Sequence, residues 1–340
     1  MIQEGLHQVV NGKNLSQTTM EKIFTEIMQG KATSAQIAAF ITALRIKGET
    51  IEEITGAAFV MRKFAIKINI ADSVVLDTCG TGGSGKHVFN VSTLSALICA
   101  ACGVKVAKHG NRSVSSKSGS ADLLEKLGVN ISAAPQIMEK CINDINIGFL
   151  FAPCFHTAMK YALGPRKEIG IRTIFNVLGP LTNPAQATCQ LLGVFKPDLV
   201  EPLANVLKNL KLNHALVVSG QDGLDEISTY TATLICELKD NQLRTYTVEP
   251  EDFNLERAEL KDIQINDVET SVKITHDLLQ GKIQGPIADI VILNAGFSLY
   301  AAEKVDSVIA GMELSRKALL QGKVKEKLNL LIKNTNAVNS

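Results

Sequence analysis

The residues most suited to binding a phosphate group lie in a glycine-rich stretch, GTGGSGK, that begins at Gly80. Gly80, Gly82 and Gly85 fit the dinucleotide-binding pattern G-x-G-x-x-G. Gly80, Gly85 and Lys86 also fit the nucleoside-triphosphate pattern G-x-x-x-x-G-K, except that His87 stands where Ser or Thr is required. Both patterns place phosphate on backbone amides, but they imply different enzymes.

The residues that follow the glycines argue against both patterns. A dinucleotide site requires an acid at the end of the next strand, where this chain has Lys108 and His109. A triphosphate loop requires a helix directly after the lysine, but Val88 is expected to be extended and the helix to begin near Asn90. Glycines still let the backbone approach an anion, and the amides after Ser92 point the positive end of a helix at the same place. The stretch therefore predicts a phosphate site of another kind.

Two more polar clusters follow predicted strands. The basic sequence KHGNR, residues 108–112, is expected to face the same anion, and the helix that opens at Ser120 offers it a second N-terminus. Asp225 and Glu226 follow a later strand. Adjacent acids near a phosphate site indicate magnesium, held directly or through water, although two solvated acids in a turn would look the same.

Side-chain chemistry alone does not determine which residues bind a second ligand that carries a carboxylate. Arg166 could bind a carboxylate through two parallel hydrogen bonds, but Lys167 and Arg172 offer the same charge. His156 either lines a pocket or is a structural histidine whose hydrogen bonds are satisfied. The sequence shows no Ser-His-Asp or Cys-His arrangement, so it predicts no covalent nucleophile.

The elements that must position these residues fall into two groups. Residues 1–70 are predicted to form short amphipathic helices, with helix starts at Ser16, Thr33 and Thr50. From residue 74 onward strands and helices alternate, which is typical of a mainly parallel sheet flanked by helices. Predicted strands cover residues 74–79, 104–107, 147–152, 191–195, 214–219 and 288–293, and predicted helices cover 92–102, 120–127, 135–143 and 198–210. A hairpin that turns at Asp240-Asn241 and a helical C-terminus complete the chain.

The predicted fold class is therefore α/β, with a small N-terminal α-helical domain and a large α/β domain whose central sheet is mostly parallel. We assign residues 1–70 to the small domain, which helices from about 155–185 could join, and residues 71–340 to the large domain. Ligands of parallel sheets lie beyond the carboxyl ends of the strands. Gly80 and Lys108 are both expected just past such ends.

The composition is that of an ordinary globular protein, with 46% apolar and 20% charged residues. A net charge of +1 and the lack of a long Lys/Arg run argue against a nucleic-acid-binding surface. No stretch of ~20 uncharged apolar residues predicts a membrane span, and the N-terminus lacks a signal-peptide pattern. Seven scattered cysteines, with a single C-x-x-C at Cys99 and Cys102, indicate a reduced, cytoplasmic protein without a zinc site.

Taken in order, the motifs of the chain resemble the anthranilate phosphoribosyltransferase family over essentially its whole length. They are DTCGTGG from Asp77, FNVST from Phe89, AKHGNR from Ala107, GSAD from Gly119, FAP from Phe151, RTIFNVLGPLTNP from Arg172 and GLDEIS from Gly223. The helical start ATSAQIAAFITALRIKGETIEEI resembles that family's first domain. The resemblance implies a helical domain hinged to an α/β domain, and a homodimer formed through the helical domain.

The resemblance also implies the substrates and the residues that bind them. Phosphoribosyl pyrophosphate is expected at Gly80, Thr81, Gly82, Gly83, Ser84, Asn90, Ser92, Thr93, Lys108 and Ser120. Anthranilate is expected near Gly80, His109, Asn111, His156, Tyr161, Arg166 and Gly179. Two magnesium ions per subunit are expected on Asp225 and Glu226, with Ser92 touching the ion nearer the pyrophosphate.

The chain departs from the family pattern at three places. Ser84 stands where the family usually has Asp, Lys86-His87-Val88 replaces small residues and Thr, and Thr157 stands where Pro often follows the histidine. The missing acid bears on how magnesium and substrate are held at the glycine turn. Lys86 could compensate in part by binding phosphate directly.

The resemblance implies that the amine of anthranilate attacks C1 of the ribose and expels pyrophosphate, a step in tryptophan biosynthesis. Orientation and electrostatics would supply the catalysis. A pyrimidine-nucleoside phosphorylase is the first alternative, because it shares the fold and a glycine-rich loop, but it would need no acidic metal pair. A non-catalytic relative that binds nucleic acid is the second, and the net charge of +1 argues against it.

Overall fold

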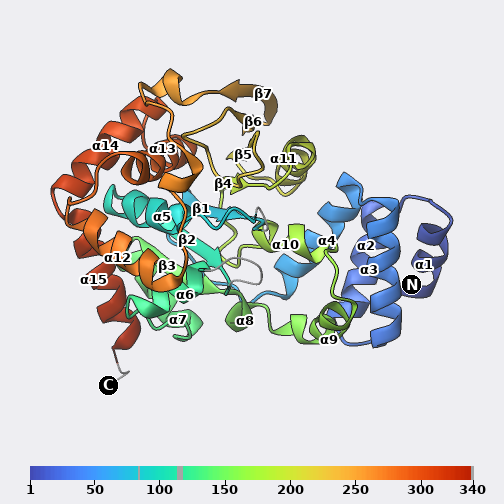
Figure 1. The fold of residues 1–340 in the computed structure, drawn as a ribbon. Coiled ribbons are helices and arrows are strands. Elements are labelled where there is room, and N and C mark those ends of the chain that lie inside the picture. The colour runs from blue at the N-terminus through green and yellow to red at the C-terminus, as the bar shows by residue number, and fades with distance from the viewer. Residues whose placement is uncertain (83–84, 113–117, 338–340) are drawn as a thin grey trace.

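A computed structural model describes residues 1–82, 85–112 and 118–337 of the chain. It has a helical N-terminal domain and a larger α/β domain, so the predicted fold class is confirmed (Figure 1). Gly83 and Ser84, two of the expected substrate-binding residues, lie outside the described residues. In the described part of the chain, no helix has the length and the apolar character that a membrane span requires.

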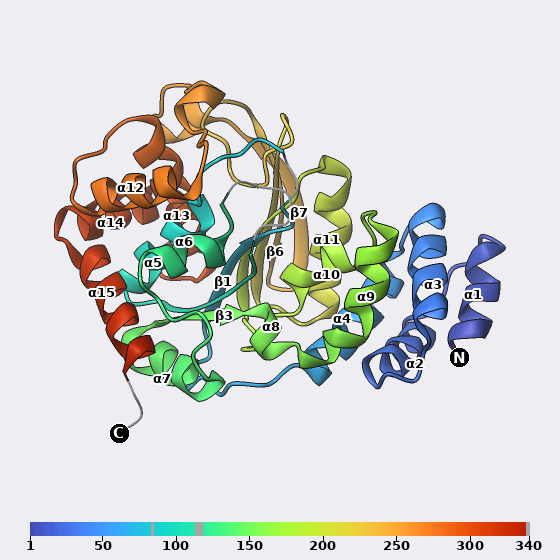
Figure 2. The same ribbon diagram turned by 60° about the horizontal axis from the view of Figure 1, so that its bottom comes forward.

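The chain begins with four helices, the last three of which begin where the sequence predicts. They are α1 (Ile2–Val10), α2 (Gln17–Met28), α3 (Ser34–Lys47) and α4 (Ile51–Phe64). The side chains of Ser16, Thr33 and Thr50 each accept a hydrogen bond from the amide three residues on, which satisfies a free N–H of α2, α3 and α4. Two later helices, α9 (Lys160–Ile169) and α10 (Phe175–Leu181), return to this region after the short helix α8 (Ala152–Phe155). Helix α9 packs against α2 and α3, and α10 packs against α4 (Figure 2).

The large domain is built on one seven-stranded sheet. Its strands are β1 (Val75–Gly80), β2 (Lys105–Gly110), β3 (Ile147–Phe151), β4 (Cys189–Gly193), β5 (His214–Gly220), β6 (Thr233–Lys239) and β7 (Gln242–Val248), in the order β3-β2-β1-β4-β5-β6-β7. The first five run parallel, and β6 and β7 form the predicted antiparallel hairpin at Asp240-Asn241. Strand β2 is longer than predicted, so Lys108 lies within the strand and not past its end.

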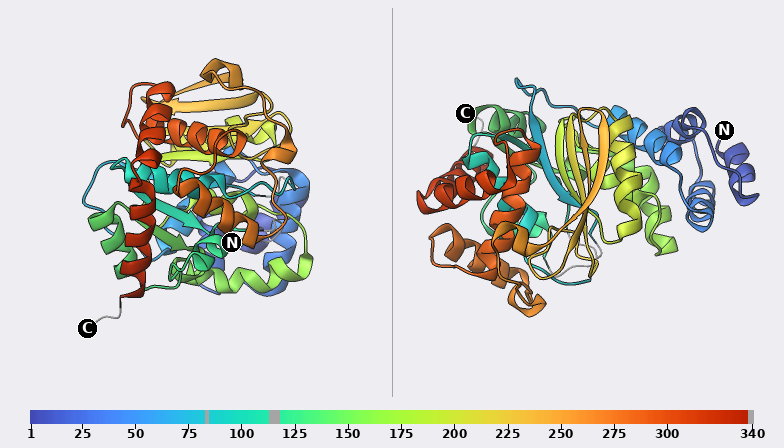
Figure 3. Two further views of the ribbon diagram at one scale, coloured as in Figure 1. Left: turned by 60° about the vertical axis from the view of Figure 1, so that its left-hand side comes forward. Right: turned by 90° about the horizontal axis from the view of Figure 1, so that it is seen from above.

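Helices cover both faces of the sheet (Figure 3). The helices of this domain are α5 (Val91–Ala101), α6 (Ser120–Lys126), α7 (Pro135–Ile145), α11 (Val200–Asn209), α12 (Val268–Leu279), α13 (Pro286–Ala301), α14 (Val308–Leu320) and α15 (Lys323–Asn336). Successive strand residues point to opposite faces. Leu216 and Val218 of β5 therefore join the core with α5 and α13, whereas Ala215 and Val217 join a core that continues through α11 into the helical domain.

One predicted strand is wrong, because residues 288–293 belong to α13. Ile290, Val291 and Leu293 are fully buried, and the helix packs against α5 and α14. A helix that is buried on all sides has no polar face, so its apolar run looks the same as that of a central strand. Pro286 at the first helical position is the signal that indicates a helix.

Candidate active site

The glycine turn and the acidic pair lie side by side where β1 and β4 end. Gly80 and Gly193 are register partners on these strands, and the amide of Thr81 donates to the carbonyl of Gly193 at 2.9 Å. The amide of Gly82 donates to Oδ2 of Asp225 at 2.9 Å. A Cβ atom on Gly193 would lie 1.8 Å from the Asp225 carbonyl oxygen, and one on Gly80 would lie 2.6 Å from its carboxylate. Glycine is therefore required on both strands for this close approach.

Lys108 and Glu226 meet at the start of α5. The Lys108 ammonium donates to the carbonyl of Thr78 at 2.6 Å and to Oγ of Ser92 at 3.2 Å. The amide of Ser92 donates to Oε1 of Glu226 at 3.2 Å. Burial and the neighbouring Asp225 raise the pKa of Glu226 to about 8, against the opposing effect of Lys108. This carboxylate is thus in a position where an added cation would stabilise its charged form.

The donor set at this point fits magnesium. Asp225 and Glu226 supply carboxylate oxygens, and Ser92 adds a hydroxyl beside them. In the described residues, no three His, Cys, Asp or Glu side chains gather into a metal-binding group. Magnesium commonly takes only one or two carboxylates from the protein and completes its shell with water and substrate phosphates. Two acids are therefore sufficient for an ion that is shared with a polyphosphate.

The other residues expected at the phosphoribosyl group surround the starts of α5 and α6. The hydroxyl groups of Thr81 and Thr93 are buried without a hydrogen-bond partner in the described structure. The amide group of Asn90 donates to the carbonyl of Ser118 at 3.1 Å. Oγ of Ser120 lies 2.4 Å from where a Cβ on Gly110 would stand, so the end of β2 and the start of α6 are in contact. Unpaired hydroxyls and helix starts both favour an anionic ligand.

Two neutral histidines lie together at the end of β2, His109 within the strand and His156 after α8. The rings of His109 and His156 have centroids 5.0 Å apart, and Nε2 of each has no hydrogen-bond partner among the described residues. Burial lowers the pKa of His156 to about 4. Burial and the neighbouring His156 lower the pKa of His109 well below its usual range, while a hydrogen bond with the backbone of Gly179 opposes the shift. Three residues expected on the anthranilate side are therefore brought together.

Arg166, Asn111 and Tyr161, which are also expected near anthranilate, each contact other parts of the chain. The guanidinium of Arg166 stacks over the ring of Phe175 at 4.9 Å. Asn111 is exposed, and its Oδ1 accepts from the amide of Arg112. The ring of Tyr161 is placed against Gly30 at the end of α2, where an added Cβ would lie 2.6 Å from it.

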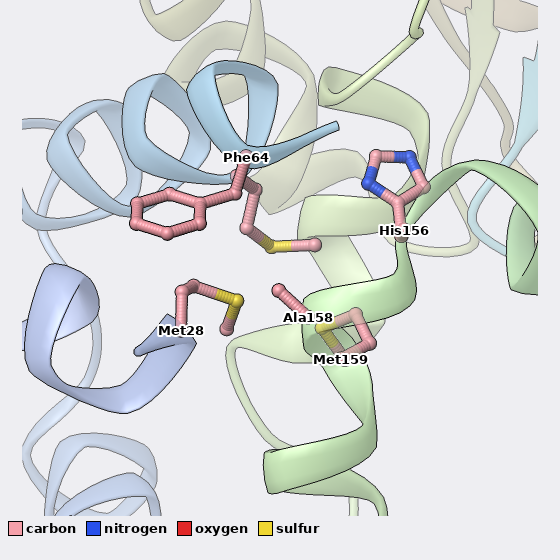
Figure 4. Close-up of a pocket in the computed structure, with 6 residues that line it drawn as sticks. Met28, Phe64, His156, Ala158 and Met159 are labelled. Atoms are coloured by element: carbon pink, nitrogen blue, oxygen red, sulfur yellow. The ribbon is translucent and has the colours of Figure 1, made fainter. Parts of the chain in front are cut away.

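His156 also lines a small, mainly apolar pocket beside the helical domain. Figure 4 shows His156 above Ala158 and Met159, with Met28 and Phe64 opposite. The thioether groups of the methionines turn toward the space between the helices (Figure 4). The lining comes from α2, α4, His156 and the 3₁₀ helix Thr157–Met159 that precedes α9.

Comparisons with known proteins identify the family of the chain. Residues 3–65 match the helical bundle domain of the glycosyl transferase family, and residues 72–325 match its α/β domain. An anthranilate phosphoribosyltransferase from Desulfosudis oleivorans is 51% identical over 98% of this chain and 99% of its own length. One from Acetivibrio thermocellus is 50% identical over 99% of this chain and 97% of its own. The chain belongs to the anthranilate phosphoribosyltransferase family.

Solved structures of anthranilate phosphoribosyltransferases share the fold. The Thermus thermophilus enzyme superposes with a TM-score of 0.93 at 38% identity, covering 98% of this chain and 99% of the other. The Saccharomyces cerevisiae enzyme in complex with PRPP (phosphoribosyl pyrophosphate) and Mg gives 0.90 at 26% identity, covering 99% and 98%. Another structure of the yeast anthranilate phosphoribosyltransferase is in complex with 4-fluoroanthranilate.

The structure also places residues at the site that the sequence did not assign to it. Arg172, which was indistinguishable from Arg166 by chemistry, donates to the carbonyl of Gly82 at 3.2 Å and stacks on the ring of Phe195 at 3.9 Å. Asp77 is fully buried and accepts from the amide of His109 at 3.1 Å. Its place inside a motif of the anthranilate phosphoribosyltransferase family was the available signal.

Proposed function

We propose that the protein transfers the phosphoribosyl group of phosphoribosyl pyrophosphate to the amine of anthranilate, as in tryptophan biosynthesis. The products would be N-(5-phosphoribosyl)anthranilate and pyrophosphate. The observation that carries this proposal is the hydrogen bond between the amide of Gly82 and Asp225, because it joins the proposed pyrophosphate-binding turn to the proposed magnesium ligand. Relatives at about 50% identity that are named anthranilate phosphoribosyltransferase support the proposal.

The residues of the turn would hold the leaving group. The nitrogen of anthranilate attacks C1 of the ribose as the bond from C1 to the pyrophosphate oxygen breaks, and the amine later loses a proton to solvent. The start of α5 and the charge of Lys108 would stabilise the negative charge that grows on pyrophosphate. Two magnesium ions, held by Asp225 and Glu226 with Ser92 nearby, would supply further positive charge at the same oxygen atoms.

The acceptor would lie on the side of the two histidines. The neutral rings of His109 and His156 each have an Nε2 atom without a partner among the described residues. These atoms could form hydrogen bonds with anthranilate without placing a positive charge beside it. Arg166 is the cation proposed to bind the carboxylate of anthranilate. Such positioning of two reactants can contribute about 7–11 kcal/mol to catalysis.

We propose further that the protein acts as a homodimer through its helical domain, in the cytoplasm. Ten large apolar side chains are exposed among the described residues, and eight of them lie in residues 1–66 or 161–171. Such a concentration favours an interface. All seven cysteines are free, which suits a reducing compartment. Light scattering should give the mass of two chains, and Phe59→Glu with Ile46→Glu should reduce it to one.

The activity is tested by the fluorescence of anthranilate. Adding phosphoribosyl pyrophosphate, magnesium and protein should abolish it, and omitting magnesium or adding a chelator should prevent the loss. No loss with folded protein and all components present would overturn the proposal. Cleavage of pyrimidine nucleosides by inorganic phosphate, without magnesium, would indicate the phosphorylase instead.

A further inference from the structure

The amide side chain of Asn90, at the start of α5, is fixed by three hydrogen bonds. Oδ1 accepts from the hydroxyl of Ser118 at 2.8 Å and from the hydroxyl of Ser271 at 2.8 Å. Nδ2 donates to the carbonyl of Ser118 at 3.1 Å. A carbonyl oxygen can only accept, so the NH2 group must face it, and the orientation of the amide is determined.

This arrangement turns Asn90 into a pure donor on its open side. An amide oxygen has two acceptor positions, and both are filled by Ser118 and Ser271. An amide nitrogen has two N–H groups, and one is used by the Ser118 carbonyl. The second N–H is free among the described residues, and Asn90 is only half-buried. A phosphate oxygen accepts from such a donor and is not repelled by the amide oxygen, which points away.

Ser271 reaches this position from a different part of the chain. It lies in α12, is fully buried, and is 181 residues from Asn90 in sequence. The start of α12 is held by Asp267, whose side chain accepts from the amide of Thr270 at 2.7 Å. The hydroxyl of Ser271 thus reaches Asn90 from α12, a helix that contains none of the expected substrate-binding residues.

The segment before α12 also supports the glycine turn. The amide of Phe89 donates to the carbonyl of Ile263 at 3.2 Å, and the amide of Ile265 donates to the carbonyl of His87 at 2.9 Å. The side chain of Gln264 donates to the carbonyl of Lys86 at 2.9 Å. Backbone bonds thus hold residues 86–89 against residues 263–265, and the bond from Ser271 continues this support to Asn90.

We infer that Ser271 is a positioning residue for the phosphoribosyl pyrophosphate site, acting through the side chain of Asn90. The inference rests on the proposed function. The hydroxyl of Ser271 fills the second acceptor position of Oδ1, so that the amide keeps its N–H directed at the substrate. Without the Ser271 hydroxyl, Oδ1 of Asn90 accepts one hydrogen bond fewer and the amide is held less firmly. Binding of phosphoribosyl pyrophosphate is then weakened.

The test is titration of phosphoribosyl pyrophosphate with magnesium, without anthranilate, into the full chain and its variants. Ser271→Ala should raise the Kd about fivefold to tenfold, as expected for one hydrogen bond. It should leave the KM for anthranilate nearly unchanged. Thr275→Val is the matched control, because Thr275 is also fully buried in α12 but, among the described residues, its hydroxyl bonds only to the backbone carbonyl of Ser271 in its own helix. The control should change the Kd less than about twofold.

A double-mutant cycle separates positioning from a general loss of structure. In an Asn90→Ala background, Ser271→Ala should no longer change the Kd, because the group on which it acts is gone. Equal Kd values for Ser271→Ala and Thr275→Val, or an effect that persists without Asn90, would overturn the inference. A wild-type chain that binds no phosphoribosyl pyrophosphate would instead overturn the proposed function. Melting temperatures of all variants identify any that do not fold.

Discussion

The amide of Gly82 donates a 2.9 Å hydrogen bond to Oδ2 of Asp225, across 143 residues of sequence. One bond therefore joins the predicted pyrophosphate turn to the predicted metal ligand. An ionised carboxylate has about four acceptor positions, so a single hydrogen bond from Gly82 does not prevent it from binding a cation. The bond also fixes the direction in which the carboxylate points before any ligand arrives, which lowers the cost of binding.

The acidic pair gives the first prediction. Replacing Asp225 by Asn and Glu226 by Gln keeps the side-chain sizes but removes both charges that would bind magnesium. We expect kcat to fall at least about 100-fold at ordinary magnesium, since the charge on pyrophosphate would lose its main stabilisation. Initial rates measured over a magnesium series check this. Asp240→Asn, in the distant β6–β7 turn, is the control and should behave as wild type.

Gly193 gives a prediction that does not depend on charge. In Gly193→Ala the new Cβ would lie 1.8 Å from the carbonyl oxygen of Asp225, so the backbone of one segment must move. We expect a loss of about 1–3 kcal/mol in the free energy of unfolding and at least a tenfold lower kcat, because the metal ligand is displaced. Urea unfolding and steady-state kinetics measure the two effects.

The control for that change is Gly164→Ala in α9. An added Cβ there has Glu168 as its nearest neighbour, at 3.9 Å. It should change the free energy of unfolding by less than about 1 kcal/mol. If Gly193→Ala were as well tolerated as Gly164→Ala, the close approach of Asp225 to β4 would not exist in solution.

Much of the fold follows from local signals in the sequence. The caps at Ser16, Thr33 and Thr50 and the hairpin at Asp240-Asn241 depend on short-range hydrogen bonds and turn preferences, and all are where they were predicted. Residues 288–293 were assigned to the wrong element because burial on every side removes the periodicity that separates helix from strand. A local pattern of apolar and polar residues cannot distinguish a helix from a strand when the element is buried on every side.

The part of the site that lies at the carboxyl ends of the strands could be predicted, because these ends meet at one edge of a parallel sheet. Gly80 and Asp225 were expected to be close because each follows or ends a strand of one parallel sheet. Ser271 carried no such signal, because a serine inside an ordinary amphipathic helix becomes informative only when its partner Asn90 is known. Tyr161 was assigned only by the family resemblance, and its ring is placed against Gly30 just after α2.

Arg166 gives a prediction about the acceptor. Arg166→Ala should raise the KM for anthranilate roughly 10- to 100-fold, the effect of losing hydrogen bonds to a charged group. The KM for phosphoribosyl pyrophosphate should change far less. Lys167→Ala, next in the chain, is the control and should leave both values within about twofold. Equal increases for the two substrates would reject the carboxylate-binding role of Arg166.

The buried His156 predicts how stability depends on pH. Its pKa is lowered to about 4 by burial, whereas an unfolded histidine has a pKa of about 6.5. Below pH 6.5 the unfolded chain therefore binds a proton that the folded chain does not, and the folded state loses stability as the pH falls toward 4. The loss should approach about 1.4 kcal/mol per pH unit, or roughly 3 kcal/mol in all.

The measurement is urea unfolding at several pH values between 7 and 4.5, for the wild type and for His156→Gln. Other groups also titrate in this range, so the difference between the two proteins isolates the contribution of His156. The variant should show a shallower decline of the free energy of unfolding, whatever its stability at pH 7. Parallel curves would mean that His156 is charged, or exposed to solvent, in the folded protein. Its neutral Nε2 could then not serve as the anthranilate contact.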